Sequence, residues 1–274
     1  MATKVIRYNP LTGEALVDVV ENVFCPTGDG GGRDPSCGRG EGGSARSSIS
    51  KLSRTDFSKL SPAELKKAAT PVGKIKTDAM GKAESMLAVE VDGVEVLFNS
   101  KTAKSAQETL ASSSEVHKGL WKQNKQIVFA SQKDPTTAAL GRQLGGDVDI
   151  LARAGTGDGS ITVWAGKSIT PAVLAHESAH NLAVNKWKSM NPDTLDKKNN
   201  FAADRKVTLQ GMRQRIPNGV TELGKSSPAE DFAEFVAAYN EIHVRGKKEY
   251  NGATEKTLSK RPKGLAVVKK LLEG

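Results

Sequence analysis

Hydrophobic and polar residues alternate in several short segments of this chain. Alternation over residues 4–8 and 14–24, on both sides of the turn-forming NPLTG, predicts a β-hairpin near the N-terminus. A second hairpin is expected where SMLAVEVDGVEVLFN reverses at Asp92 and Gly93. The segment KQIVFAS predicts a further strand, and DVDILARAG and SITVWAG on either side of TGDG predict a third hairpin.

Other segments have the composition and periodicity of helices. SPAELKKAA predicts a short helix with Ser61 as N-cap and Pro62 in its first turn. Further helices are expected at TAKSAQETLASSSEVHKGLWKQ, PAVLAHESAHNLAVN (capped by Ser168 or Thr170), AEDFAEFVAAYNEIHV and GLAVVKKLLEG, with short helical pieces around DKKNNFAADRKVTLQGM. Because mixed strands come first and helices later, we expect an α+β fold in which a small mixed or antiparallel sheet packs on a helical layer.

Composition divides the chain into three parts. Residues 1–25 contain the first hairpin, and residues 26–58 are so rich in glycine and serine that they predict a flexible linker. Residues 59–274 are expected to form the α+β domain. The start, MATKVIRYNP, lacks the apolar core of a signal peptide, and no apolar run is long enough for a transmembrane helix. These features predict a cytoplasmic or virion-associated protein without a membrane partner.

The charge of the chain limits its partners only slightly. Lys and Arg number 40 against 31 Asp and Glu, which gives a formal charge of +9. Such an excess favours acidic partners, including nucleic acid, but no recognition motif accompanies it. Nucleic-acid binding is therefore possible on these grounds but not favoured.

The most specific pattern is HESAH, at His176 to His180. Two histidines four residues apart lie on one face of a helix, one turn from each other, so both imidazoles can reach one metal ion. Glu177 points about 100° further round the helix, beside the metal position. This is the H-E-x-x-H pattern of zinc hydrolases, in which the glutamate moves a proton between water and the leaving group.

The residues around this trio are almost all apolar. Alanine, valine and leucine surround His176, Glu177 and His180 on every side of the expected helix, whereas a surface helix shows a polar stripe. Two ordinary histidines and a glutamate buried there without partners would cost several kcal/mol. The sequence therefore predicts a buried helix with one bound zinc ion.

A catalytic zinc ion commonly has three protein ligands, so a third is needed. Ala183 and Lys186 stand where a metzincin has glycine and histidine, and Cys25 and Cys37 are poorly placed for a deformylase-type ligand. Glu230 and Glu234, on the later helix, are about 40° apart around its axis and opposite an aromatic stripe. A solvated amphipathic helix shows the same pattern. We prefer Glu230 as ligand and Glu234 as acceptor for a histidine N–H, with exchange of these roles as the alternative.

HESAH, followed about fifty residues later by PAEDFAEFVAAY, resembles the gluzincin metallopeptidases, in particular the group around the anthrax lethal factor catalytic domain. The resemblance covers roughly residues 160 to 245. It implies His176, His180 and Glu230 as zinc ligands and Glu177 as the base. It also implies an edge strand that aligns the substrate just before the zinc helix, for which SITVWAG is the candidate.

The chain departs from this group in one respect. The group has a tyrosine a few residues before the ligand helix that stabilises the oxyanion, but GVTELGKSSP contains none. Tyr239 and His243 are expected on the far side of the helix by angular count. The oxyanion donor is therefore unassigned, and metal binding is better supported than turnover.

Cys25 and Cys37 bracket PTGDGGGRDPS. Two isolated cysteines are a weak zinc signal, and an incidental pair in a plain linker is the simplest interpretation. A sharper hypothesis is latency, with the Cys37 thiolate in the open zinc position. The flanking Cys-Pro-Thr-Gly and Asp-Pro-Ser-Cys segments resemble parts of phage head-associated polypeptides, which would suit a hairpin that anchors the chain to a larger assembly.

Two functions follow from these patterns. The first is a zinc-dependent endopeptidase that acts on a protein or peptide substrate. The second is a basic structural or nucleic-acid-associated protein, for example of a phage particle, that retains the site without catalysis. The sequence does not predict the peptide that is cleaved.

Overall fold

The computed structural model describes residues 3–8, 15–20, 49–77, 79–133, 151–155, 159–164, 168–186, 219–225 and 228–273. At the N-terminus, β1 (Thr3–Tyr8) and β2 (Ala15–Val20) pair antiparallel, as the alternation around NPLTG predicts. The helical pieces expected around DKKNNFAADRKVTLQGM, and both cysteines, lie outside the described residues.

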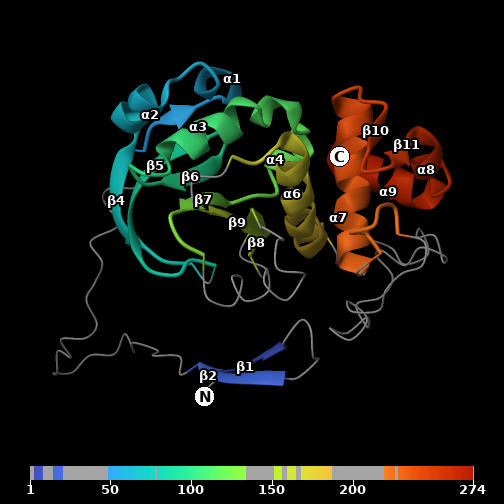
Figure 1. Ribbon diagram of the computed structural model, residues 1–274, viewed down its shortest axis with the longest axis horizontal. Coiled ribbons are helices and arrows are strands. Elements are labelled where there is room, and N and C mark those ends of the chain that lie inside the picture. The colour runs from blue at the N-terminus through green and yellow to red at the C-terminus, as the bar shows by residue number, and fades with distance from the viewer. Residues whose placement is uncertain are drawn as a thin grey trace, which may run out of the picture.

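A seven-stranded mixed sheet forms the centre of the fold (Figure 1). Its order is β3-β5-β6-β7-β9-β8, and β4 pairs with β5 beside β3. The β6–β7 and β7–β9 pairs are parallel, while β5–β6 and β8–β9 are antiparallel. The strands are β3 (Lys51–Leu52), β4 (Thr70–Ile75), β5 (Glu84–Val91), β6 (Val94–Phe98), β7 (Gln126–Ala130), β8 (Ala152–Ala154) and β9 (Ser160–Trp164). The α+β class with a mixed sheet is confirmed.

The hairpin turns have the predicted chemistry. Asp92 and Gly93 have φ values of 45° and 83°, so the β5–β6 turn needs two left-handed residues in succession. Asp-Gly supplies them at low cost, which explains why this hairpin is readable from the sequence. The β8–β9 hairpin is also present, although β8 has only 3 residues.

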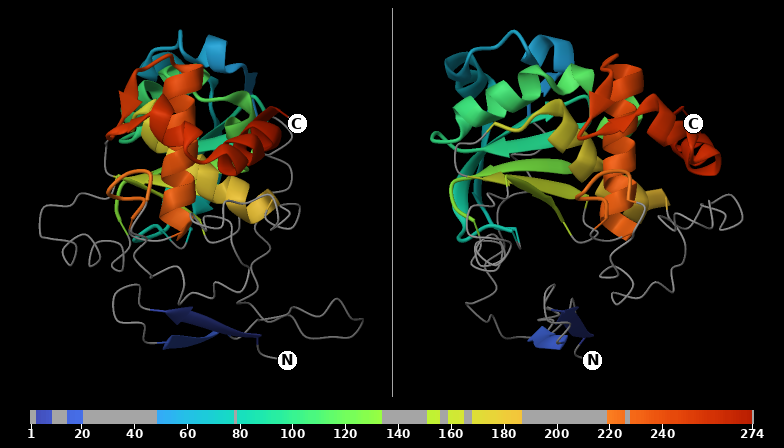
Figure 2. Two further views of the ribbon diagram at one scale, coloured as in Figure 1. Left: turned by 90° about the vertical axis from the view of Figure 1, so that its right-hand side faces the viewer. Right: turned by 45° about the vertical axis from the view of Figure 1, so that its right-hand side comes forward.

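The main core lies between one face of the sheet and the helices (Figures 1 and 2). Alternate strand residues such as Ile127 and Phe129 point into it, while Val128 and Trp164 belong to a smaller cluster on the opposite face. The helices are α1 (Arg54–Phe57), α2 (Pro62–Ala68), α3 (Ala103–Ala111), α4 (Lys118–Trp121), α6 (Pro171–Lys186), α7 (Pro228–Tyr239), α8 (Glu255–Ser259) and α9 (Pro262–Glu273).

The prediction of a single helix over residues 102–123 is wrong. The chain instead forms α3, the 3₁₀ turn η2 (Ser113–Glu115) and α4. Ser112 and Ser113 donate their hydroxyls to the carbonyls of Thr109 and Leu110, which are acceptors of the last turn of α3. Consecutive serines therefore end the helix by competing for its backbone.

The folded domain also begins earlier than expected. Residues 51–58, assigned to the linker from composition, form β3 and α1. The Phe57 side chain is fully buried in the main core, and Arg54 pairs with Asp92 at 3.1 Å. The boundary at residue 58 was wrong because one aromatic side chain anchors a segment whose composition is otherwise polar.

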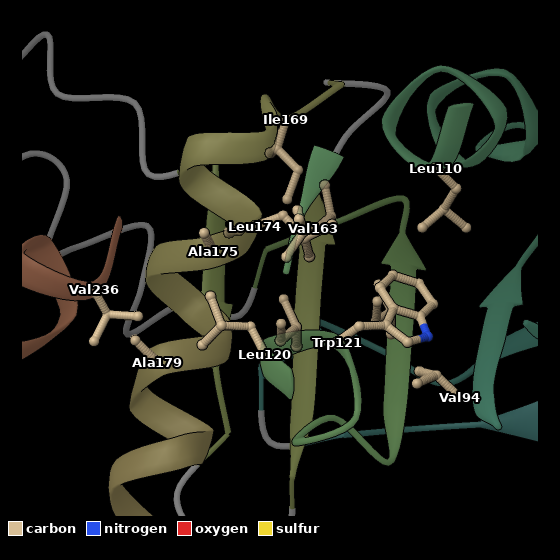
Figure 3. Packing of buried hydrophobic residues seen from close by; sticks show 14 of the residues in the cluster. Val94, Leu110, Leu120, Trp121, Val163, Ile169, Leu174, Ala175, Ala179 and Val236 are labelled. Atoms are coloured by element: carbon tan, nitrogen blue, oxygen red, sulfur yellow. The ribbon is translucent and has the colours of Figure 1, made fainter. Parts of the chain in front are cut away.

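Helices α6 and α7 lie side by side at the end of the sheet where β8 and β9 are found (Figure 1). Figure 3 shows Ala179 of α6 next to Val236 of α7, with Leu174 and Leu120 in the core near Val163. Small residues on α6 let the two helices approach closely. The C-terminal part adds the π-helix η6 (Asn240–Val244) and a hairpin of β10 (Glu249–Tyr250) and β11 (Ala253–Thr254). Within the described residues, no helix combines the length and apolar composition needed to cross a bilayer.

Candidate metal centre

Helix α6 starts where the sequence places it. Thr170 Oγ1 accepts a hydrogen bond from the Val173 backbone N–H at 3.4 Å, so Thr170 is the cap among the two predicted candidates. Ser168 instead donates to Glu108. Pro171 occupies the first turn, where its missing N–H is tolerated.

The predicted burial of α6 is confirmed. Ala175, Ala179 and Leu182 have no exposed surface, and His176 and Glu177 are themselves buried. A network of Ser178, Asn181 and Asn124 fixes the sheet-facing side of the helix, with Asn181 donating to Asn124 at 2.9 Å and Asn124 donating to Ser178 at 2.9 Å. The histidine-bearing side of α6 faces α7.

His176 and His180 direct their Nε2 atoms to one place. These two nitrogens are 3.2 Å apart, and the rings meet edge to face with centroids 4.9 Å apart. The Glu230 carboxylate of α7 lies 3.1 Å from His176 Nε2 and 3.7 Å from His180 Nε2. The ligand atoms of all three residues fall within 4.8 Å of one another, so the group could hold a metal ion.

Glu234 occupies a different position from Glu230. Its Oε1 accepts a hydrogen bond from His176 Nδ1 at 2.8 Å, on the far edge of the imidazole from Nε2. The Glu234 side chain is 1% exposed, whereas that of Glu230 is 31% exposed. Glu230 thus contacts the two Nε2 atoms, and Glu234 holds Nδ1 of His176, which leaves Nε2 as the nitrogen that could bind a metal. These positions correspond to Glu230 as ligand and Glu234 as acceptor for a histidine N–H.

The electrostatics of the group are dominated by these carboxylates. Burial lowers the pKa of His176, but hydrogen bonds to Glu230 and Glu234 outweigh it and raise that pKa to about 10. Burial raises the pKa of Glu230, yet its hydrogen bonds with His176 and His180 hold the pKa well below its usual range. A metal ion would therefore take the place of a proton on His176.

Glu177 lies against the edge of the sheet. Its Oε2 accepts a hydrogen bond from the Ala154 backbone N–H of β8 at 2.6 Å. The candidate edge strand SITVWAG corresponds to β9, which lies between β7 and β8 and is therefore internal. Among the described strands β8 forms this edge, because the antiparallel β8–β9 hairpin adds its first strand on the outside.

Three other predicted or considered residues are not brought to the metal group. Tyr239 stacks on His243 with ring centroids 4.6 Å apart, and His243 pairs with Glu255 at 2.9 Å, so both lie elsewhere, as angular counting predicts. Glu241 of η6 pairs with Arg245, which directly follows that helix. Neither Cys37 nor Cys25 is in the described part of the chain.

Two residues of the site were missed by sequence reasoning. Thr221 donates to Glu234 Oε2 at 2.6 Å, and Tyr250 donates to Glu234 Oε1 at 3.0 Å. Asn251 and Gly252 after Tyr250, with φ values of 45° and 80°, are a hairpin signal that could have revealed β10 and β11. No local pattern indicates that this hairpin reaches Glu234.

Searches against models of known protein families and against curated proteins give no match for this chain.

Proposed function

We propose that the protein is a zinc-dependent metalloendopeptidase that hydrolyses peptide bonds. One observation carries the proposal. His176 and His180 of α6 and Glu230 of α7 converge on one position, while Glu177 of α6 contacts the edge strand β8. Metal ligands, a candidate base and a candidate peptide-binding edge thus meet at one place. That combination is the one that metal-assisted hydrolysis needs.

The donor set fits zinc. Two imidazole nitrogens and one carboxylate leave a fourth position open in a tetrahedral site, and His176 is held from behind by Glu234 as zinc-bound histidines commonly are. When bound, zinc would supply Lewis acidity that polarises a carbonyl and lets water lose a proton near neutral pH. The partial exposure of Glu230, 31%, provides access for a substrate.

Glu177 is the group that moves the proton. Its carboxylate takes a proton from the attacking water and returns it to the amine nitrogen as the peptide bond breaks. The Ala154 N–H restricts the rotation of this carboxylate and keeps it at the β8 edge. Burial around Glu177 limits access of bulk water to the same position.

Strand β8 is the element that aligns the substrate. Hydrogen bonds from Gly155 N to Ser160 O and from Trp164 N to Leu151 O show that residues 151 and 155 bond toward β9. Since antiparallel strands alternate, Ala152 and Ala154 direct their backbone groups away from β9, toward a side that no described strand covers, as the Ala154–Glu177 bond also indicates. An extended peptide can add there as a further strand, next to Glu177.

The test begins with metal content. Protein purified without chelators should contain about one zinc per chain. His180→Ala should lose it, and Glu177→Gln, which keeps an acceptor for Ala154, should retain it. Absence of zinc from the wild-type protein, and from the protein after zinc is added back, would refute the proposal.

Turnover is tested with a mixed peptide library. The wild type should cleave it, and Glu177→Gln should lose about 10²–10⁴-fold in rate, the range for removal of a general base. Glu222→Gln is the matched control, because Glu222 is an exposed glutamate in the segment before α7 that pairs with Lys225. Bound zinc without any Glu177-dependent cleavage would favour the non-enzymatic alternative.

A further inference from the structure

The Glu234 carboxylate joins three segments that are distant in the sequence. Its Oε1 accepts hydrogen bonds from His176 Nδ1 at 2.8 Å and from the Tyr250 hydroxyl at 3.0 Å. Its Oε2 accepts from the Thr221 hydroxyl at 2.6 Å. The donors come from α6, from β10 and from the segment 219–225, so the orientation of this buried carboxylate depends on all three.

We propose that Tyr250 is a positioning residue for the metal group. Its hydroxyl holds Glu234 Oε1 where it accepts the Nδ1–H of His176, and thereby keeps the His176 Nε2 lone pair directed at the position shared with His180 and Glu230. This inference rests on the metal binding of the proposed function and adds a residue outside the H-E-x-x-H helix and the ligand helix.

A buried carboxylate needs donors to have one orientation. With Tyr250 and Thr221 in place, each oxygen of Glu234 is fixed by a donor other than His176. Without the tyrosine hydroxyl, Oε1 keeps His176 as its only described donor, and Thr221 at Oε2 is left to resist rotation of the carboxylate about its last bond. The imidazole then gains a second orientation, and binding a metal requires it to be ordered again.

Tyr250 is suited to act as a permanent donor. Burial and the negative charge of Glu234 raise the pKa of its hydroxyl, so the hydroxyl stays protonated throughout the pH range in which proteins fold. The hydroxyl reaches Glu234 on the Nδ1 side of His176, away from Nε2. Tyr250 therefore acts through Glu234 and is not the oxyanion donor that the sequence left unassigned.

The Tyr250 hydroxyl can be removed by substitution while the aromatic ring is kept. Its side chain also borders a cavity of about 390 Å³ that is lined by Pro171, Ala172 and Arg245 among others. Tyr250→Phe removes one oxygen and keeps the ring, so the fold is expected to persist. Tyr239→Phe is the control, since Tyr239 is a mostly buried tyrosine whose ring stacks on His243 and has no contact with Glu234.

The experiment measures zinc affinity by competition with a chromophoric chelator, and the visible absorption of the cobalt(II)-substituted protein. Tyr250→Phe should weaken zinc binding about tenfold, the lower end of the range for groups that support metal ligands. It should also change the cobalt(II) bands, while Tyr239→Phe should leave both within experimental error. Thr221→Val, which removes the donor to the other oxygen, should weaken binding in the same direction.

The outcomes separate the two proposals. Wild-type protein that binds no zinc overturns the proposed function and this inference with it. Wild-type affinity and unchanged cobalt(II) bands in Tyr250→Phe overturn only the positioning role. If Tyr250→Phe is destabilised in its metal-free form, Thr221→Val provides the test instead. An unchanged zinc affinity of Thr221→Val would then contradict a role of the Glu234 hydrogen bonds in metal binding.

Discussion

Helix α7 and the π-helix η6 that continues it each bury a glutamate, and they do so in different ways. Glu241 in η6 is 1% exposed, and its Oε2 contacts Arg245 Nη1 at 2.5 Å and Lys247 Nζ at 2.8 Å. Glu234 in α7 is equally buried, but its partners are His176, Thr221 and Tyr250. One carboxylate has permanent cations beside it, and the other has a histidine whose charge depends on what it binds.

This difference separates a carboxylate with a fixed positive partner from one whose positive partner can be exchanged. A buried carboxylate is costly unless a positive charge compensates it. Lysine and arginine provide this charge permanently at Glu241, whereas at Glu234 it is a proton on His176 or, in the proposed function, a metal ion. A metal site requires a positive partner that can be exchanged, whereas a structural ion pair requires one that is always present.

Arg261→Met should have the largest effect on stability. Arg261 contacts Asp231, the neighbour of Glu230, at 2.8 Å, and both side chains are almost fully buried. Loss of the fixed cation leaves Asp231 buried without it, so we expect the free energy of unfolding to fall by about 3–5 kcal/mol. Urea denaturation of the metal-free protein measures this, with the exposed Lys269→Met as control. A loss below about 1 kcal/mol would contradict a fixed-charge role.

Under the proposed function, Glu234→Gln should reduce the stability that bound zinc would provide. A ligand at a thousand times its Kd stabilises the folded state by about 4 kcal/mol. A 10–100-fold weaker affinity, expected when the partner of a ligand histidine is changed, removes about 1.4–2.7 kcal/mol of this at the same zinc concentration. Unfolding with and without zinc, compared between the variant and the wild type, measures the difference. An unchanged zinc-dependent gain would show that Glu234 does not support the metal group.

Glu241→Gln should lower the stability of the protein without changing its zinc affinity. The change removes the charge that Arg245 and Lys247 share, so we expect about 1–2 kcal/mol lower stability. Zinc affinity should be unchanged, because Glu241 has no contact with the metal group among its described interactions. A shift of more than about threefold in zinc Kd would mean that the Glu241 ion pairs are coupled to the metal group.

The smallest effect concerns a histidine outside the metal group. Burial lowers the pKa of His117, whose Nδ1 accepts a hydrogen bond from the Gly119 N–H at the start of α4. Because the folded state holds this proton less well than the unfolded state, stability is full above the ordinary pKa near 6.5 and falls as pH drops below it. His117→Asn keeps a capping side chain without titrating, so it should lose less stability, by under about 1 kcal/mol, between pH 7 and pH 5. If the free energy of unfolding of the wild type and of His117→Asn fell in parallel between pH 7 and pH 5, His117 would be excluded as a source of the loss of stability in acid.

Local signals predicted the elements that carry the site. Thr170 and Pro171 mark the start of α6, Asp92 and Gly93 set the central hairpin, and the spacing of His176 and His180 places both rings on one face. Each of these features depends on residues within one turn or one hairpin, which is the range over which backbone preferences act.

The features that were missed depend on contacts between distant segments. Residues 51–58 have the composition of a linker, yet Phe57 enters the core. The hydroxyls of Thr221 and Tyr250 meet at Glu234 only after α6, α7 and β10 are assembled. A hydrogen bond between residues far apart in sequence leaves no periodic trace, so a single sequence cannot reveal it.

The bonds at Glu234 and Asp231 also set a C-terminal limit for any fragment in which this metal group can keep its geometry. A fragment that ends with α7 would contain every residue of the two recognisable motifs. It would lack Tyr250, which holds Glu234, and Arg261, which holds Asp231. Transplantation of the site into another scaffold, or its dissection by limited proteolysis, therefore has to preserve the chain from β8 to the start of α9.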